Sequence, residues 1–182
     1  MPRLTLIGYR GCGKTTVATL VADQLGCGWL DADSELEARE GRTIASLIRD
    51  RGEAAFREAE AAVLAGLLGA RGENAFAGVL ATGGGAVLRP ANRDLLRRHA
   101  RPIVWLTAPA DVIRTRLAAD PTTRDRRPGL RGGDPLAEVA TALDERAPLY
   151  RECADLAVDT AAATPEEIAA QVVAWLARGP AP

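Results

Sequence analysis

Short apolar runs alternate with longer stretches of helical spacing along the whole chain. The runs that read as strands are Leu4–Ile7, Trp29–Leu30, Val79–Ala81, Ile103–Leu106 and Leu156–Asp159. Between the first two, apolar residues recur at Val17, Leu20, Val21 and Leu25, which is a helical spacing. The alternation predicts an α/β fold in which a parallel sheet carries helices on both faces. Ligands of such sheets bind beyond the carboxyl ends of the strands, so the loops that follow strands are the place to look for chemistry.

Local signals set the expected limits of the helices. We predict helices over about residues 16–25, 34–40, 43–51, 53–68, 92–99, 109–119, 135–151 and 164–178. Thr164 and Pro165 are typical of the N-cap and first position of the last of these helices. The segment Asp120–Asp134 is rich in Arg, Gly and Pro and is expected to form a mobile loop. Neither a linker nor an internal repeat divides the chain, so we expect a single domain over residues 1–182.

The segment after the first strand, Gly8–Thr15, fits the phosphate-loop pattern G-x-x-x-x-G-K-[ST] between a strand and a helix. In this pattern successive N–H groups surround a phosphate, and the helix N-terminus adds partial positive charge. Lys14 would contact the β- and γ-phosphates, and the Thr15 hydroxyl is a hard oxygen ligand for Mg²⁺. The alternative is a glycine turn with a purely structural role. The expected residues of an ATP and Mg²⁺ site are Gly11, Cys12, Gly13, Lys14, Thr15 and Thr16.

The composition singles out the lysine of this loop. Lys and Arg together number 23, but Lys14 is the only lysine in the sequence. A lone lysine among arginines indicates a position where a compact ammonium is needed. The only lysine also excludes the Asn-Lys-x-Asp motif by which GTPases read guanine, because Lys14 belongs to the phosphate loop.

Two carboxylates follow the second strand. Asp31 and Asp33 are one residue apart at its end, so both are expected above the sheet. One could hold the Mg²⁺ hydration shell while the other accepts a proton from a substrate hydroxyl. Asp33 could equally cap the following helix, and the two roles are compatible.

Three further features could bind an acceptor. Arg57 and Glu60 are three residues apart, so they share a helix face. Arg57 could bind a substrate carboxylate with two parallel hydrogen bonds, or simply form an ion pair with Glu60. Gly83–Gly85 follow a strand and would let a ligand approach bare backbone, or form a flexible turn. Arg146 is either a second arginine that binds a carboxylate or a charge on the exposed face of a helix.

Several arginines gather in the segment expected to be a mobile loop. They are Arg124, Arg126, Arg127 and Arg131. As a lid they would close over transferring phosphates and exclude water. A solvated basic loop is the alternative.

Together these segments resemble the shikimate kinases, and the resemblance runs to about Asp159. It rests on Gly8–Thr16, Asp31–Asp33, Phe56–Arg57 with Glu60, Ala81–Val87, Arg127–Pro128 and Glu145–Tyr150. The cysteine in the phosphate loop and the Gly-Gly-Asp-Pro-Leu stretch near residue 134 are most similar to the second enterobacterial isozyme. The resemblance implies a three-layer α/β/α P-loop kinase fold with a five-stranded parallel sheet in the order 2-3-1-4-5. It also implies a substrate-binding helical region at about residues 33–60 and a mobile lid at about 120–134.

For the acceptor, the resemblance implies shikimate as the substrate. Asp33 would bind its hydroxyls and act as the base, and Arg57 and Arg146 would hold its carboxylate. Gly83, Gly84 and Gly85 would line the pocket, and Glu60 would support Arg57.

For the nucleotide, the resemblance implies that Lys14 and Thr15 serve ATP and Mg²⁺, with Asp31 holding the metal through water. Arg127 would reach the phosphates from the lid, and Arg116 is similar to an arginine that stacks on adenine. The Arg10 position is not prescribed by the P-loop pattern.

Charge and cysteine content limit the partners and the compartment. Lys plus Arg is 23 and Asp plus Glu is 24, a formal net charge of −1, so we expect neither a nucleic-acid nor a membrane partner. Three cysteines without close pairing and no recognisable signal peptide favour the cytoplasm, and we expect a monomer. The alternatives in function are a kinase for gluconate or a nucleoside monophosphate, and a non-catalytic ATP-binding regulator.

Overall fold

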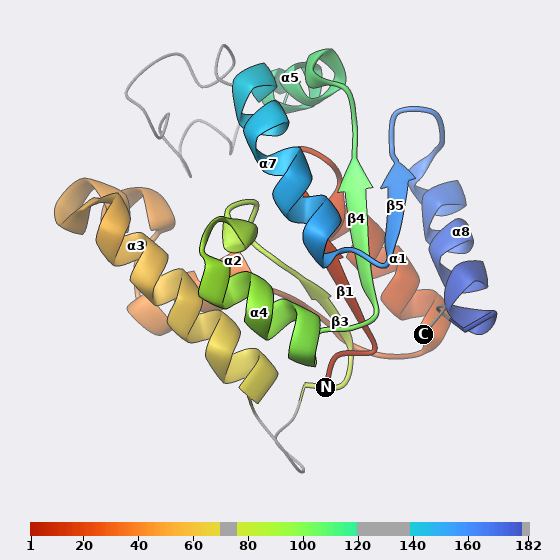
Figure 1. Cartoon of the computed structure of the whole chain (residues 1–182), viewed down its shortest axis with the longest axis horizontal. Coiled ribbons are helices and arrows are strands. Elements are labelled where there is room, and N and C mark those ends of the chain that lie inside the picture. Colours follow the sequence, from red (N-terminus) through yellow and green to blue (C-terminus); the bar gives the residue numbers. More distant parts are fainter. Residues whose placement is uncertain (70–75, 120–138, 180–182) are drawn as a thin grey trace.

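The computed structural model describes residues 1–69, 76–119 and 139–179 (Figure 1). The strands are β1 Leu4–Ile7, β2 Trp29–Asp31, β3 Val79–Ala81, β4 Ile103–Thr107 and β5 Leu156–Asp159. The helices are α1 Lys14–Leu25, α2 Ala32–Glu40, α3 Ile44–Gly69, α4 Pro90–His99, α5 Ala110–Ala119, α7 Val139–Cys153 and α8 Pro165–Ala177, with a 3-10 helix, η2, at Ala86–Leu88.

All strand pairs are parallel, and the sheet has the order β2-β3-β1-β4-β5. The central strand β1 pairs with β3 on one side, where Leu6 lies opposite Ala81, and with β4 on the other. Both the parallel sheet and the order 2-3-1-4-5 are therefore confirmed. This order brings the carboxyl ends of β1, β2 and β3 together at one edge, so the three loops with the predicted site residues are neighbours.

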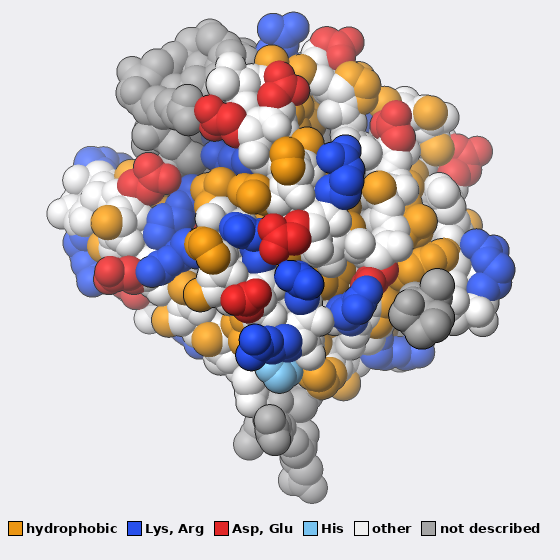
Figure 2. Space-filling model, in the orientation of Figure 1, with side chains coloured by type: hydrophobic (Ala, Val, Ile, Leu, Met, Phe, Trp, Pro, Cys, Tyr) orange, Lys and Arg blue, Asp and Glu red, His pale blue; other side chains and the backbone are white. Residues whose placement is uncertain are grey.

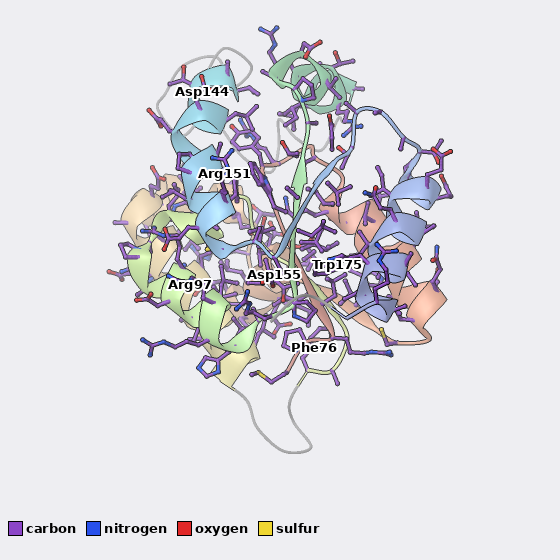
Figure 3. The ribbon with its side chains drawn as sticks, turned by 45° about the vertical axis from the view of Figure 1, so that its right-hand side comes forward. Phe76, Arg97, Asp144, Arg151, Asp155 and Trp175 are labelled. Atoms are coloured by element: carbon purple, nitrogen blue, oxygen red, sulfur yellow. The ribbon has the colours of Figure 1, made fainter. Side chains whose placement is uncertain are left out.

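Helices cover the two faces of the sheet, which confirms the three-layer architecture (Figure 1). On one face α1 and α8 pack against alternate strand residues such as Leu6 and Val104, and Trp175 of α8 joins this cluster (Figure 3). On the other face α3, α4 and α7 pack against the residues between them, among them Leu80 and Ile103. Every residue of β1 and β3 is buried, and most of β4 is, which explains why these central strands are apolar runs rather than alternating patterns.

Helix limits differ from the prediction where loop residues adopt helical geometry. The first helix begins at Lys14 rather than at residue 16, so the phosphate-loop lysine is its first residue. The expected break between the third and fourth helices is present inside α3 at Gly52, whose φ of 82° and ψ of 166° are not helical. Only glycine adopts this geometry readily, so Gly52 redirects the chain between the two parts of α3.

Surface charges of both signs are mixed over α4 and α7 on the face shown in Figure 2. Arg93 lies 2.8 Å and Arg97 3.5 Å from the carboxylate of Glu152. Where α7 ends, the half-buried Asp155 accepts from the N–H of Ile103 at 2.7 Å and pairs with Arg101 (Figure 3). In the described ranges, no helix is both long and apolar enough to span a bilayer.

Tyr150 of α7 fixes the loop that follows β3. Its ring is buried and stacks on Trp105 of β4 at 5.7 Å between centroids. Its hydroxyl donates to the Gly84 carbonyl at 2.6 Å. Burial strongly raises the pKa of Tyr150, partly opposed by the nearby charge of Arg146, so the phenol stays protonated and remains a donor.

Tyr150→Phe should lower the free energy of unfolding by about 1–2 kcal/mol at pH 8, because a buried carbonyl loses a donor. Unfolded tyrosine ionises near pH 10, whereas folded Tyr150 keeps its proton above that pH. The contribution of Tyr150 to the free energy of unfolding is therefore complete below pH 10 and is lost as the pH rises. The difference in free energy of unfolding between wild type and variant, measured with urea, should be smaller at pH 10.5 than at pH 8 by about 1 kcal/mol. A difference that stays constant would contradict this reading.

Candidate active site

The phosphate loop turns back sharply between β1 and α1. Gly8, with a φ of 143°, lies so close to the Leu106 carbonyl of β4 and to Cys12 that a Cβ at this position would overlap both. Cys12 is fully buried beneath the loop. The start of the loop is therefore packed tightly against the neighbouring strand.

The Lys14 ammonium lies inside this loop. It donates to the carbonyl oxygens of Gly8 at 2.8 Å and Tyr9 at 3.0 Å. These carbonyls hold a positive charge over the N-terminus of α1, where the helix dipole also favours an anion. The loop is thus arranged to receive phosphate oxygens.

A hydroxyl and a carboxylate meet beside the loop. The Thr15 hydroxyl donates to Asp31 Oδ2 at 3.0 Å, and Asp31 Oδ1 accepts from the N–H groups of Asp33 at 2.9 Å and Ser34 at 3.3 Å. Asp31 is therefore the N-cap of α2. The prediction that Asp33 could cap this helix is wrong, because the helix begins at Ala32 and places Asp33 in its first turn.

Thr15 and Asp31 form a pair of hard oxygen donors that fits Mg²⁺. One oxygen of Asp31 is already engaged by the helix N-terminus, which leaves Oδ2 as the side that faces Thr15. In the described residues no cluster of three or more His, Cys, Asp or Glu side chains could enclose a metal by itself. The pair therefore suits a metal that keeps most of its water and its phosphate ligands.

Arg57 of α3 is held by carboxylates on its own helix. Its guanidinium is 2.8 Å from buried Glu60 and 3.2 Å from Glu53, and it lies over the Phe56 ring at 4.8 Å. The side chain is only 11% exposed. Glu60 is therefore close enough to orient Arg57, as the prediction requires.

The glycines after β3 lie against these side chains. A Cβ on Gly83 would be 2.5 Å from Asp33 Oδ1 and 2.8 Å from Glu60, and one on Gly85 would overlap the Arg57 guanidinium. A Cβ at either position would therefore displace these side-chain groups. The three glycines thus let the aspartate and the arginine reach the same loop.

From the opposite side, α7 contributes Arg146. Its guanidinium donates to the Gly84 carbonyl at 3.3 Å and lies over the Tyr9 ring at 5.2 Å. Arg57 and Arg146, which are far apart in the sequence, therefore flank one loop of three glycines. The predicted acceptor residues Asp33, Arg57, Glu60, Gly83, Gly84, Gly85 and Arg146 form one group.

Arg116 of α5 lies on the other side of the phosphate loop. It donates to the Thr160 hydroxyl at 2.9 Å and to its carbonyl at 2.6 Å. It lines a pocket of about 180 Å³ together with Cys12, Gly13, Thr16, Thr160 and Pro165. The sequence pattern did not indicate Thr160 and Pro165 as pocket residues, although Thr160 directly follows the last strand, where ligands of parallel sheets bind.

The lid expected at about residues 120–134, with Arg127 and the other lid arginines, lies outside the described residues. The described helices α5 and α7 flank this segment.

Comparison with known proteins agrees with this arrangement. The shikimate kinase family model matches residues 10–177. A shikimate kinase of Rhodopirellula baltica is 41% identical over 93% of this chain and 88% of its own length. That of Thiobacillus denitrificans is 45% identical over 87% and 81%, and shikimate kinase 2 of Escherichia fergusonii is 40% identical over 95% and 91%.

Solved structures show the same relationship. A shikimate kinase from Acinetobacter baumannii in complex with shikimate superposes with a TM-score of 0.85 at 32% identity, covering 96% of this chain and 92% of that one. A gluconokinase from Sinorhizobium meliloti, at 20% identity and a TM-score of 0.56 over 97% and 92% of the two chains, shares the fold alone. Since the family model matches most of the sequence and several curated relatives are at least 40% identical, the chain belongs to the shikimate kinase family.

Proposed function

We propose that this chain transfers the γ-phosphoryl group of ATP to a hydroxyl of shikimate, giving shikimate 3-phosphate and ADP in the pathway to chorismate and the aromatic amino acids. The observation that carries the proposal is the meeting of Arg57, Arg146 and Asp33 at the Gly83–Gly85 loop. Two guanidiniums beside one carboxylate suit a compact acceptor with a carboxylate and neighbouring hydroxyls.

Each acceptor residue has a distinct task in the proposal. Arg57 and Arg146 bind the shikimate carboxylate and so fix the orientation of its ring. Asp33 orients the hydroxyl and accepts its proton as the oxygen bonds to the γ-phosphorus and the bond from that phosphorus to the ADP oxygen breaks. Glu60 keeps Arg57 in place. Positioning of this kind supplies much of the acceleration in phosphoryl transfer.

On the nucleotide side, Lys14 exchanges the carbonyls of Gly8 and Tyr9 for phosphate oxygens and neutralises charge there. The Thr15 hydroxyl would hold Mg²⁺, and Asp31 would hold it through water. Mg²⁺, when bound, neutralises phosphate oxygens as the phosphoryl group moves. Arg116 stacks on the adenine in the pocket beside the phosphate loop.

The proposal takes residues 1–182 as a single kinase domain. One sheet carries both the phosphate loop and the acceptor group, and one chain supplies all the described site residues. We infer that a monomer is sufficient for activity.

The proposal predicts shikimate-dependent turnover in a coupled ADP-release assay with Mg·ATP. Gluconate, AMP and no acceptor serve as the comparisons, and Lys14→Ala should lower kcat/KM by more than about a hundredfold because the phosphate charge loses its ammonium. Turnover with another acceptor would keep the kinase and discard shikimate. ATP binding without any turnover would favour a regulator.

Arg57→Lys should raise KM for shikimate by about 10- to 100-fold and KM for ATP by less than about twofold. Lysine keeps a charge near Glu60 but cannot fork onto a carboxylate. The matched control is Arg51→Lys, an exposed arginine in the part of α3 before Gly52, which should leave both constants unchanged. Equal losses for both substrates in Arg57→Lys would refute the carboxylate role.

Gly85→Ala should raise KM for shikimate about tenfold, because the new methyl group would displace the Arg57 guanidinium. Folding stability should change little, since the end of a flexible side chain can move. Gly28→Ala is the control, because nothing lies within 4 Å of a Cβ there. Steady-state kinetics and urea unfolding of both variants test this prediction. An unchanged KM for shikimate in Gly85→Ala would argue against a shikimate site at the Gly83–Gly85 loop.

A further inference from the structure

Tyr9 occupies the first variable position of the phosphate loop, where the motif prescribes no residue type. Its side chain is nevertheless buried, with 5% exposure. It belongs to a cluster that joins the loop to α5 through Ile113 and Leu117 and to α7 through Val139. The ring thus connects the loop to the helix that carries Arg146.

Two guanidinium groups lie over the Tyr9 ring. The guanidinium carbon of Arg146 is 5.2 Å from the ring centroid, and that of Arg10 is 5.8 Å away. Both distances are within the range of a cation–π contact. Arg146 also interacts with the Tyr150 hydroxyl and donates to the Gly84 carbonyl, but the latter bond is long at 3.3 Å, so the Tyr9 ring is one of the groups that orient the guanidinium.

The two arginines of the acceptor group are held in different ways. Arg57 has the carboxylates of Glu53 and Glu60 as partners. The described contacts of Arg146 are instead to uncharged groups, namely the Tyr9 ring, the Gly84 carbonyl and the Tyr150 hydroxyl. An aromatic face orients a guanidinium without supplying a competing anion. Arg146 is therefore placed with its charge available to an incoming carboxylate.

Tyr9 also touches the nucleotide side, because its carbonyl accepts from the Lys14 ammonium at 3.0 Å. We propose that Tyr9 is a positioning residue for the acceptor, whose ring seats Arg146 beside the glycine loop and thereby sets the affinity for a carboxylated substrate. This inference rests on the proposed function. It adds a residue that contacts both cations, Lys14 through its backbone and Arg146 through its ring.

The test compares Tyr9→Leu, which keeps apolar volume but removes the ring, with Tyr9→Phe, which keeps the ring. Tyr9→Leu should raise KM for shikimate about 3- to 10-fold, the range of a partly desolvated cation–π contact, and KM for ATP by less. Tyr9→Phe should restore KM for shikimate to within about twofold of wild type. The control is Ile113→Val, which loosens the same cluster and should not change KM for shikimate.

A double-mutant cycle distinguishes the orientation of Arg146 by the Tyr9 ring from a general loss of packing around Tyr9. In an Arg146→Gln background, Tyr9→Leu should add less than about twofold to KM for shikimate, because the seated cation is gone. The same cycle applied to the free energy of unfolding in urea measures the contact between ring and guanidinium without any substrate. The effects of the two substitutions should be non-additive.

Each outcome decides between the hypotheses. Tyr9→Leu could change KM for shikimate equally in both backgrounds, or by as much as Ile113→Val does. Either result would overturn the role of Tyr9. The proposed function would still stand if the wild type turned over shikimate. A wild type that does not turn over shikimate would overturn the proposed function and with it the acceptor role. If the two substitutions had additive effects on the free energy of unfolding, the contact between the Tyr9 ring and the Arg146 guanidinium would be refuted.

Discussion

The candidate site depends on one steric constraint, the absence of side chains at Gly83, Gly84 and Gly85. A Cβ at the first of these positions would meet Asp33, and one at the last would overlap Arg57. The carbonyl of the middle glycine accepts from the α7 residues Arg146 and Tyr150. Bare backbone thus lets groups from α2, α3 and α7 approach one short loop. Because β3 lies between β2 and β1 in the sheet, the same loop is next to the phosphate loop, so an acceptor held there would be near a bound nucleotide.

A second dependence is electrostatic. Asp31 caps α2 with one carboxylate oxygen and accepts from the Thr15 hydroxyl with the other. A residue that appears in sequence as a candidate metal partner is therefore also the residue that begins the helix carrying Asp33. The two tasks are compatible because a carboxylate has two oxygens and the N-terminus of a helix favours a negative charge. The position of Asp33 above the sheet thus follows from the same carboxylate that accepts from the Thr15 hydroxyl.

The sequence predicted most of the elements, because their signals are local. The strands at β1, β3 and β5 were predicted with the observed limits, and the capping residues of α8 have the predicted roles. The strand order came from the family resemblance, since an alternating pattern is compatible with several orders. The assignment of Asp33 as a possible helix cap failed because N-cap identity depends on which residue first adopts helical geometry. Thr160 lies at a strand end and could have been singled out on that ground, but its pairing with Arg116, 44 positions away, could not have been predicted.

The sequence by itself determined the phosphate loop, the alternation that makes the sheet, and the residue types available to bind an acceptor. These features depend on neighbouring residues or on a repeating pattern, which the order of amino acids contains directly. Only the tertiary structure decided which of the charged side chains meet. An ion pair of Arg57 with Glu60 is predictable from helix spacing, but the placement of Arg146 on the ring of Tyr9 is not. That contact joins the first loop to a late helix, and it exists because the sheet order and the packing of α7 bring the two together.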